Sequence, residues 1–144
     1  MKSRYLNKEY TKKFRAYCKR WAHTPTGYLS RQYTQMMGRV KGQKKDHLQY
    51  KGLPILPRKE FYKWALQRTS PFFNMWRAYE ASGFQLTLAP SIDRIDGTKG
   101  YLESNIQFLT LGENVKKSFQ GERYGRNSKQ KRIVGLLRTP TIVA

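Results

Sequence analysis

The sequence predicts an α+β protein: a mainly α-helical N-terminal part, then a strand–loop–strand–helix unit, then a basic tail. Three observations predict this order. Large apolar side chains recur every three or four residues over most of the first 82 residues, as in amphipathic helices. Two short β-type runs follow between residues 92 and 109, and the residues after 118 are rich in glycine, lysine and arginine. A chain of 144 residues is long enough for one domain with arms and too short for two independent cores.

The first helix is expected from residue 7 to residue 22, followed by a second one after Pro25 and Gly27. On the first helix we expect the apolar face to belong to the core, in preference to an aromatic stacking platform. That face holds Tyr10, Phe14, Tyr17, Cys18 and Trp21, and the opposite face carries Lys12, Lys13, Lys19 and Arg20. The second helix has the apolar stripe Leu29, Tyr33, Met36, Met37 and Val40, and its candidate DNA-binding residues are Arg31, Arg39, Lys41, Lys44 and Lys45.

Residues 42–57 have the glycines, prolines and charges of a loop. Phe61, Trp64 and Ala65 then indicate a short amphipathic helix. Ser70 is placed to cap a further helix that reaches residue 82, and Gly83 is placed to end it. These two helices carry most of the large apolar residues and are expected to form the core.

The segment from residue 91 to residue 118 contains the strand–loop–strand–helix unit. Residues 92–95 and 105–109 are the expected strands, and Thr110 and Glu113 have the spacing of a capping box at the start of the helix. Asp93 on the first strand and Asn114 in the first helical turn could converge on one cation. The spacing equally allows turn-forming aspartates with Asn114 at the surface.

The charge of the chain is concentrated at its two ends. Lys and Arg number 29 against 9 Asp and Glu, so the formal net charge of +20 favours a polyanionic partner. Residues 1–51 carry a net +12, residues 52–114 a net +1 and residues 115–144 a net +7. The middle stretch holds six of the nine carboxylates, which fits either a bound divalent cation or ordinary surface ion pairs.

Composition also excludes several classes of protein. An aromatic content of 14% is too high for a disordered basic tail, and a single cysteine excludes an internal disulfide and a cysteine-based zinc site. No apolar run reaches the roughly 18 residues that span a bilayer, and the first eight residues lack the apolar stretch of a secretory signal. We therefore expect a cytoplasmic protein with no membrane partner.

Four short groups of residues in the 91–118 segment form a pattern: Asp93-Arg94-Ile95-Asp96, Lys99-Gly100-Tyr101, Asn105-Ile106 and Asn114. This pattern resembles the ββα-metal finger of HNH (His-Me finger) endonucleases, particularly the small ones of phages and homing elements. The resemblance covers roughly residues 50–118. It implies that Asp93 and Asn114 bind Mg²⁺ or Mn²⁺ and that Asn105 fixes the loop geometry. A phage protein of this kind would act in the cytoplasm of the host cell.

The sequence departs from the family at Arg94, where the water-activating histidine usually stands. Arginine stays protonated and cannot accept a proton, although it could place positive charge on the scissile phosphate. The base could be metal-bound hydroxide, Asp96, or a histidine from elsewhere, of which His47 is the better candidate and His23 the other. The finger could also bind DNA without cutting it.

The resemblance therefore predicts a metal-dependent endonuclease that nicks DNA, most plausibly double-stranded, as a monomer or homodimer. Residues 1–51 would be a basic helical DNA-binding segment, 52–118 the nuclease core and 119–144 a basic tail, with Lys116 and Lys117 on the DNA backbone. The alternative is a nucleic-acid-binding protein that does not cleave, associated with RNA or the ribosome or acting on DNA. A weaker alternative is a structural protein that condenses DNA in a nucleoid or capsid.

Overall fold

The computed structural model describes residues 8–43 and 45–121. Within them the chain forms five α-helices and one two-stranded antiparallel sheet, so the α+β prediction is confirmed. Lys44 and residues 122–144 lie outside the described residues, and with them all but the first three residues of the predicted tail, which belong to the last helix. Among the described residues, none of the helices combines the length and the apolar character needed to cross a membrane.

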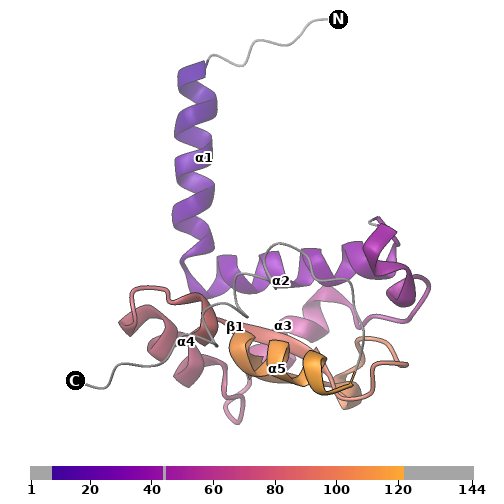
Figure 1. The fold of residues 1–144 in the computed structure, drawn as a ribbon. Coiled ribbons are helices and arrows are strands. Elements are labelled where there is room, and N and C mark those ends of the chain that lie inside the picture. The colour runs from indigo at the N-terminus through magenta and orange to yellow at the C-terminus, as the bar shows by residue number, and fades with distance from the viewer. Residues whose placement is uncertain (1–7, 44, 122–144) are drawn as a thin grey trace, which may run out of the picture.

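Helices α1 (Lys8–Ala22) and α2 (Pro25–Val40) meet at a corner. Figure 1 shows α2 lying along the body of the protein while α1 stands away from it. Thr24 caps α2, because its Oγ1 accepts a hydrogen bond from the Gly27 backbone N at 3.2 Å. Only glycine fits at position 27, since a Cβ there would lie 1.9 Å from the Trp21 carbonyl oxygen. The corner is therefore fixed by a cap and by one close backbone approach.

The prediction that the aromatic face of α1 belongs to the core is wrong. Tyr10, Phe14 and Tyr17 are 55%, 55% and 57% exposed, and Trp21 and Cys18 are exposed as well. Packing between α1 and its neighbours is confined to the corner, where Ala22 is buried. Helical periodicity identified the apolar face correctly, but no other element of the described chain covers it.

Helix α2 buries one face against the body. Its buried side chains are Leu29, Tyr33, Met36 and Val40, which include four of the five predicted stripe positions, with Met37 partly buried beside them. The following segment is less irregular than predicted, because residues Lys45–Tyr50 form a 3₁₀ helix. The Gly52 backbone N donates to the Val40 carbonyl at 2.9 Å and ties the end of this segment to α2.

Helices α3 (Arg58–Leu66) and α4 (Phe72–Ala81) follow, close to their predicted positions. The Ser70 hydroxyl accepts a hydrogen bond from the Phe72 backbone N at 3.2 Å, but the N-cap position is occupied by Pro71, one residue later than predicted. Gly83 has a φ of +71° and its N donates to the Glu80 carbonyl, so it ends α4 as predicted.

Strands β1 (Pro90–Arg94) and β2 (Ile106–Thr110) form the sheet, and helix α5 (Leu111–Gly121) follows β2 directly. The capping box at the start of α5 is confirmed. The Thr110 backbone N donates to Glu113 Oε2 at 2.8 Å, and the Glu113 backbone N donates to Thr110 Oγ1 at 3.2 Å.

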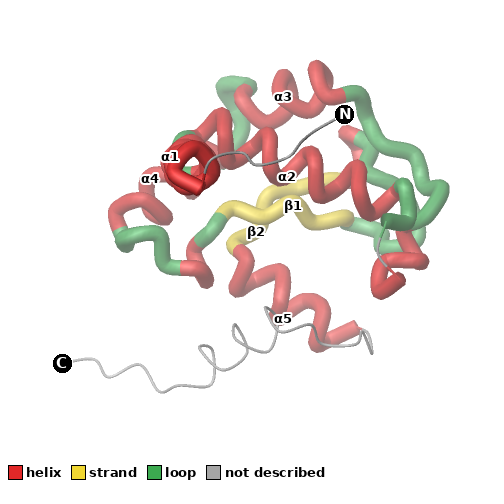
Figure 2. Tube along the Cα trace, turned by 90° about the horizontal axis from the view of Figure 1, so that it is seen from above, coloured by secondary structure: helices red, strands yellow, loops and turns green. Residues whose placement is uncertain are grey.

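The sheet lies between the main core and α5 (Figure 2). On its core face Ile92 pairs with Phe108, and the Phe108 ring stacks on Trp64 of α3 with ring centroids 4.7 Å apart. Phe72 and Trp76 of α4 complete this aromatic core. The other face carries Ser91, Asp93, Gln107 and Leu109 and is covered by α5, and the candidate site lies there.

Candidate functional site

The register of the sheet sorts the residues of β1 onto two faces. Side chains alternate along a strand, and residues paired across an antiparallel sheet share a face. Ser91 and Asp93 therefore lie on the α5 face together with Gln107, the partner of Asp93. Arg94 pairs with Ile106 and belongs to the core face. Two neighbouring residues of the predicted motif, Asp93 and Arg94, thus begin on opposite sides of the sheet.

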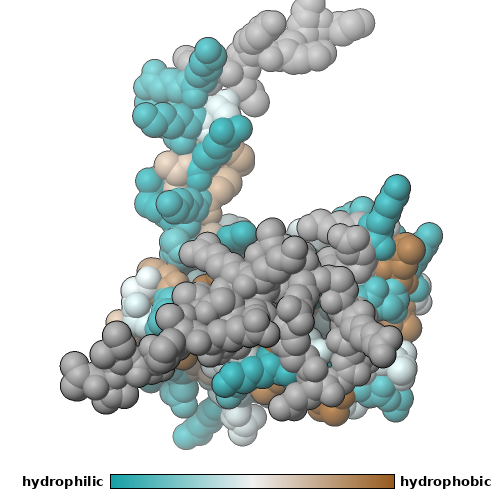
Figure 3. Space-filling model, viewed as in Figure 1, coloured by the Kyte–Doolittle hydropathy of each residue, from teal (hydrophilic) through white to brown (hydrophobic). Residues whose placement is uncertain are grey.

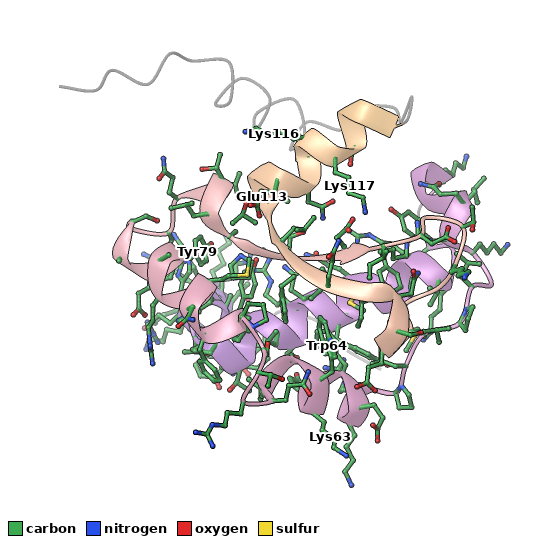
Figure 4. The ribbon with its side chains drawn as sticks, turned by 90° about the horizontal axis from the view of Figure 1, so that it is seen from below. Lys63, Trp64, Tyr79, Glu113, Lys116 and Lys117 are labelled. Atoms are coloured by element: carbon green, nitrogen blue, oxygen red, sulfur yellow. The ribbon has the colours of Figure 1, made fainter. Side chains whose placement is uncertain are left out.

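Asp93 is a buried carboxylate with two partners. Its side chain is 9% exposed, and Oδ2 accepts hydrogen bonds from Gln107 Nε2 at 2.9 Å and from Lys117 Nζ at 2.6 Å. The Lys117 ammonium also donates to the Arg94 carbonyl at 3.0 Å. Figure 4 shows Lys117 extending from α5 toward the sheet. An internal cation therefore neutralises Asp93, which lowers the cost of burying it.

Asn114 lies on the side of α5 that faces the sheet. Its Nδ2 donates to the Ser91 hydroxyl at 2.6 Å, and its carbonyl accepts from Ser118 Oγ at 3.0 Å. Ser91 and Asp93 share one face of β1, so Asn114 and Asp93 are both at the interface between β1 and α5. The described residues contain no group of three or more His, Cys, Asp or Glu able to hold a metal ion. A cation here would depend on one carboxylate, one amide and the phosphate or water that it brings.

Asn105 closes the loop between the strands. Its Nδ2 donates to the carbonyls of Asp96 at 3.0 Å and Gly100 at 2.9 Å, and its Oδ1 accepts from the Asp96 backbone N at 2.9 Å. The side chain is buried, so each of these bonds satisfies a polar group with little access to water. The three bonds hold both ends of the loop at fixed positions.

The Arg94 guanidinium lies on the core face of the sheet and is bound there by the loop between the strands and by an aromatic ring. It donates to the Lys99 carbonyl at 2.8 Å and lies 4.1 Å from the centroid of the Tyr50 ring. Tyr101 lies on the same side, and Arg39 donates to its hydroxyl at 3.2 Å. Burial is the main cause that raises the pKa of Tyr101 above its ordinary value. Arg94 thus has cation–π contacts with Tyr50 and Tyr101, and Arg39 has one with Tyr50.

The candidate bases differ in what surrounds them. Asp96 accepts hydrogen bonds from the Thr98 hydroxyl and backbone N at 2.6 and 2.9 Å, and these bonds lower the pKa of its carboxyl. A carboxylate with a lowered pKa is a weaker base at neutral pH. His23 packs on Phe84, with ring centroids 4.3 Å apart, near the α1–α2 corner. The backbone of His47 lies in the 3₁₀ helix, but its side chain is outside the described set.

The predicted DNA-binding residues fall into two groups. Arg31, Lys41, Lys45 and Lys116 are exposed, and Figure 4 shows Lys116 pointing away from the sheet. Lys117 is also exposed, but its ammonium is bound to Asp93, and the partly buried Arg39 is bound to the Tyr101 hydroxyl. The first four cations are available to phosphate without breaking any contact on which the fold depends.

Several residues of the site were not predicted from the sequence. Gln107 shares the Asp93 carboxylate, Ser91 binds Asn114, and Tyr28 of α2 donates its hydroxyl proton to the Pro90 carbonyl at the start of β1. Alternation within two antiparallel strands would have placed Gln107 and Ser91, once the register was known. Tyr28 contacts a residue 62 positions away, for which the local pattern contains no signal.

Comparison of the chain with protein-family models, with curated proteins and with solved structures finds no match. The functional argument therefore depends on the residues of the chain and their geometry.

Proposed function

We propose that this protein is a Mg²⁺- or Mn²⁺-dependent endonuclease that hydrolyses phosphodiester bonds in DNA. The observation that carries the proposal is the buried carboxylate of Asp93 at the same β1–α5 interface as Asn114, inside a chain of net charge +20. A buried carboxylate repels a nucleic acid unless a cation lies between them, and a divalent cation bridges carboxylate and phosphate. The resemblance of residues 91–118 to HNH endonucleases supports the same assignment.

The residues present fit a hard divalent cation. Asp93 would supply a carboxylate oxygen and Asn114 an amide oxygen, and Mg²⁺ commonly takes one or two protein ligands and completes its shell with water and phosphate. The Lys117 ammonium binds the Asp93 carboxylate at 2.6 Å, so a positive charge occupies this position in the folded protein. A metal ion would compete with the Lys117 ammonium for Oδ2 of Asp93, so binding requires the lysine to move.

The protein's own residues would position the substrate and the reacting groups. Bound at Asp93 and Asn114, the metal would supply Lewis-acid stabilisation of the charge that develops on the scissile phosphate. Lys117, once displaced from Asp93, would contact the same phosphate, and Lys116, which points away from the sheet, would contact the neighbouring backbone. Asn105 keeps the loop closed beside the strand. Arg94 is engaged on the core face and is assigned no proton transfer, because its guanidinium cannot accept one.

A plasmid-nicking assay tests the proposal. We expect supercoiled plasmid to be nicked with Mg²⁺ or Mn²⁺ and left intact with EDTA. Asp93→Ala should reduce the rate at least about 100-fold, because it removes the only carboxylate assigned to the metal. Gln107→Ala is the control, since it removes a partner of Asp93 without removing a proposed ligand, and should retain most of the activity. A clean wild-type preparation that shifts the plasmid without nicking it would refute the nuclease.

A metal titration without DNA separates binding from cleavage. Lys117→Met removes the competing ammonium and keeps much of the aliphatic side chain. We expect it to tighten Mn²⁺ binding about threefold to tenfold, measured by electron paramagnetic resonance of free Mn²⁺. Lys116→Met removes the same charge from a side chain that points away from the sheet and should leave the affinity within about twofold of wild type.

The Lys117–Asp93 ion pair also favours a second function. A protein that binds nucleic acid without cutting it would need Asp93 neutralised permanently, and the 2.6 Å pair does this without a metal. This alternative predicts that the wild-type protein neither binds Mn²⁺ nor nicks plasmid in Mg²⁺ or Mn²⁺. The titration and the nicking assay distinguish the two.

A further inference from the structure

Helix α1 carries a row of exposed aromatic side chains, which we call the α1 aromatic stripe. Its members are Tyr10, Phe14, Tyr17 and Trp21. They follow one another at intervals of four, three and four residues, so they lie on one narrow side of the helix over about 16 Å of its axis. The rings of Tyr10 and Phe14 are nearly parallel, with an interplanar angle of 7° and centroids 6.3 Å apart. Three rings that are more than half exposed are therefore presented together, and Trp21, which lies against Gly27 at the corner, continues the row.

The stripe lies on a strongly basic helix. Between Lys8 and Ala22 there are six Lys and Arg side chains and one acidic residue, Glu9, which forms an exposed ion pair with Lys13 at 2.9 Å. Arg20 lies beside the stripe, less than a third of a turn from Tyr17. Figure 3 shows the charged side chains of α1, in teal, on either side of paler apolar ones along the part that stands clear of the body. Charge complementarity thus calls for an anionic partner.

We infer that α1 binds single-stranded nucleic acid, whose bases stack on the aromatic stripe while its phosphates contact the flanking lysines and arginines. Aromatic rings beside a basic groove are the common means of holding single strands, because every base has a π-face. In a duplex the faces of the bases are already stacked on one another, so they are not available to stack on the aromatic side chains of the stripe. This binding surface is separate from Asp93, and its test is independent of the proposed cleavage.

A second copy of the chain fits the stripe less well. Two α1 helices packed together would bring a net +5 against a net +5, and the stripe has no Leu, Ile or Val to fill the gaps of a helix pair. An anionic lipid surface would satisfy the charge, but it would show no preference for bases. The experiment below distinguishes a second copy of the chain and a lipid surface from single-stranded nucleic acid.

Fluorescence anisotropy of the full-length protein with a labelled 20-nucleotide oligo(dT) tests the inference, in EDTA so that no cleavage can occur. The triple variant Tyr10→Leu, Phe14→Leu, Tyr17→Leu keeps the apolar area, the charge and the helix propensity but removes three π-faces. We expect it to bind oligo(dT) at least about 100-fold more weakly than wild type, since three stacked bases each contribute at least about fivefold. Affinity for a duplex of equal length should change less than threefold. Tyr10→Phe, Tyr17→Phe keeps the rings and should bind oligo(dT) like wild type.

Three outcomes would overturn the inference. One is an equal loss of affinity for oligo(dT) and duplex in the triple leucine variant, which would indicate a general structural effect. Another is unchanged oligo(dT) binding in that variant. The last is a dimer in sedimentation that the leucine variant strengthens, or binding to vesicles of anionic lipid that oligo(dT) cannot displace. Circular dichroism of the triple variant should match wild type, because the substituted side chains are exposed.

Discussion

Helix α1 and the β1–β2–α5 unit place opposite kinds of side chain in opposite environments. In α1 three large aromatic residues are more than half exposed, whereas in the β1–β2–α5 unit Asp93, Arg94 and Asn105 are buried. The second region tolerates buried polar groups because each has a specific partner. Asp93 pairs with the Lys117 ammonium, Arg94 donates to the backbone carbonyl of Lys99, and Asn105 binds the loop backbone. The comparison indicates that both regions depart from the usual distribution of polar and apolar residues, which is a feature of functional surfaces.

The largest expected effect is a difference in stability between removing an aromatic ring from the core and removing one from the α1 aromatic stripe. Phe61 is fully buried in α3 and contacts Tyr33 and Trp64, whereas Phe14 is exposed on α1. We expect Phe61→Ala to lower the free energy of unfolding by about 3–5 kcal/mol and Phe14→Ala by less than about 0.5 kcal/mol. Urea denaturation of both variants measures this. A comparable loss for Phe14→Ala would show that something in the folded protein covers the stripe.

A second pair of variants tests the tight packing of the loop between the strands. A Cβ at Gly100 would lie 2.0 Å from the Pro54 carbonyl oxygen, which also accepts the Tyr101 backbone N at 2.9 Å, whereas a Cβ at Gly97 meets nothing within 4 Å. We expect Gly100→Ala to cost about 3 kcal/mol, because backbone must move to admit the methyl group. Gly97→Ala should stay within about 0.5 kcal/mol of wild type. Equal stabilities in thermal denaturation would contradict the close approach of the loop to residues 54–56.

Removing the loop-closing amide should cost somewhat less. Asn105→Ala leaves the Asp96 and Gly100 carbonyls and one backbone N–H without their present partner, so we expect a loss of about 2–3 kcal/mol. Asn74→Ala makes the same change at an exposed position of α4 and should cost less than about 0.5 kcal/mol. Chemical denaturation of the two variants gives the comparison, and similar midpoints would mean that the loop is held by other contacts.

The smallest effect is a pH dependence at the tip of the same loop. The hydrogen bonds from Thr98 lower the pKa of the Asp96 carboxyl in the folded state, so Asp96 stabilises the fold above about pH 4 and ceases to do so as the pH falls through the lowered pKa. Asp96→Ala should therefore lower the thermal midpoint slightly at pH 7 and leave it unchanged in acid. Asp96→Asn keeps an acceptor for Thr98 and should show no such pH dependence. A difference that grows on acidification would reverse the assigned sign.

The sequence by itself predicted the features whose partners lie close together along the chain. The capping box of Thr110 and Glu113, the stop at Gly83 and the five helices follow from interactions over three or four residues, which any local pattern contains. The two strands were likewise predicted from their local β-type runs, although their register was not. The charge that favours a nucleic-acid partner is a property of composition alone.

Only the tertiary structure decided which apolar faces are covered and which charges are free. Periodicity shows that Tyr10, Phe14 and Tyr17 share a face, but whether another element packs on that face depends on the angle at the α1–α2 corner. The pairing of Lys117 with Asp93, 24 residues apart, likewise depends on how α5 crosses the sheet. Such contacts arise from the relative placement of whole elements, which no local pattern specifies. They decide whether an amphipathic helix is covered or exposed, and whether a lysine is unpaired or neutralises a buried carboxylate.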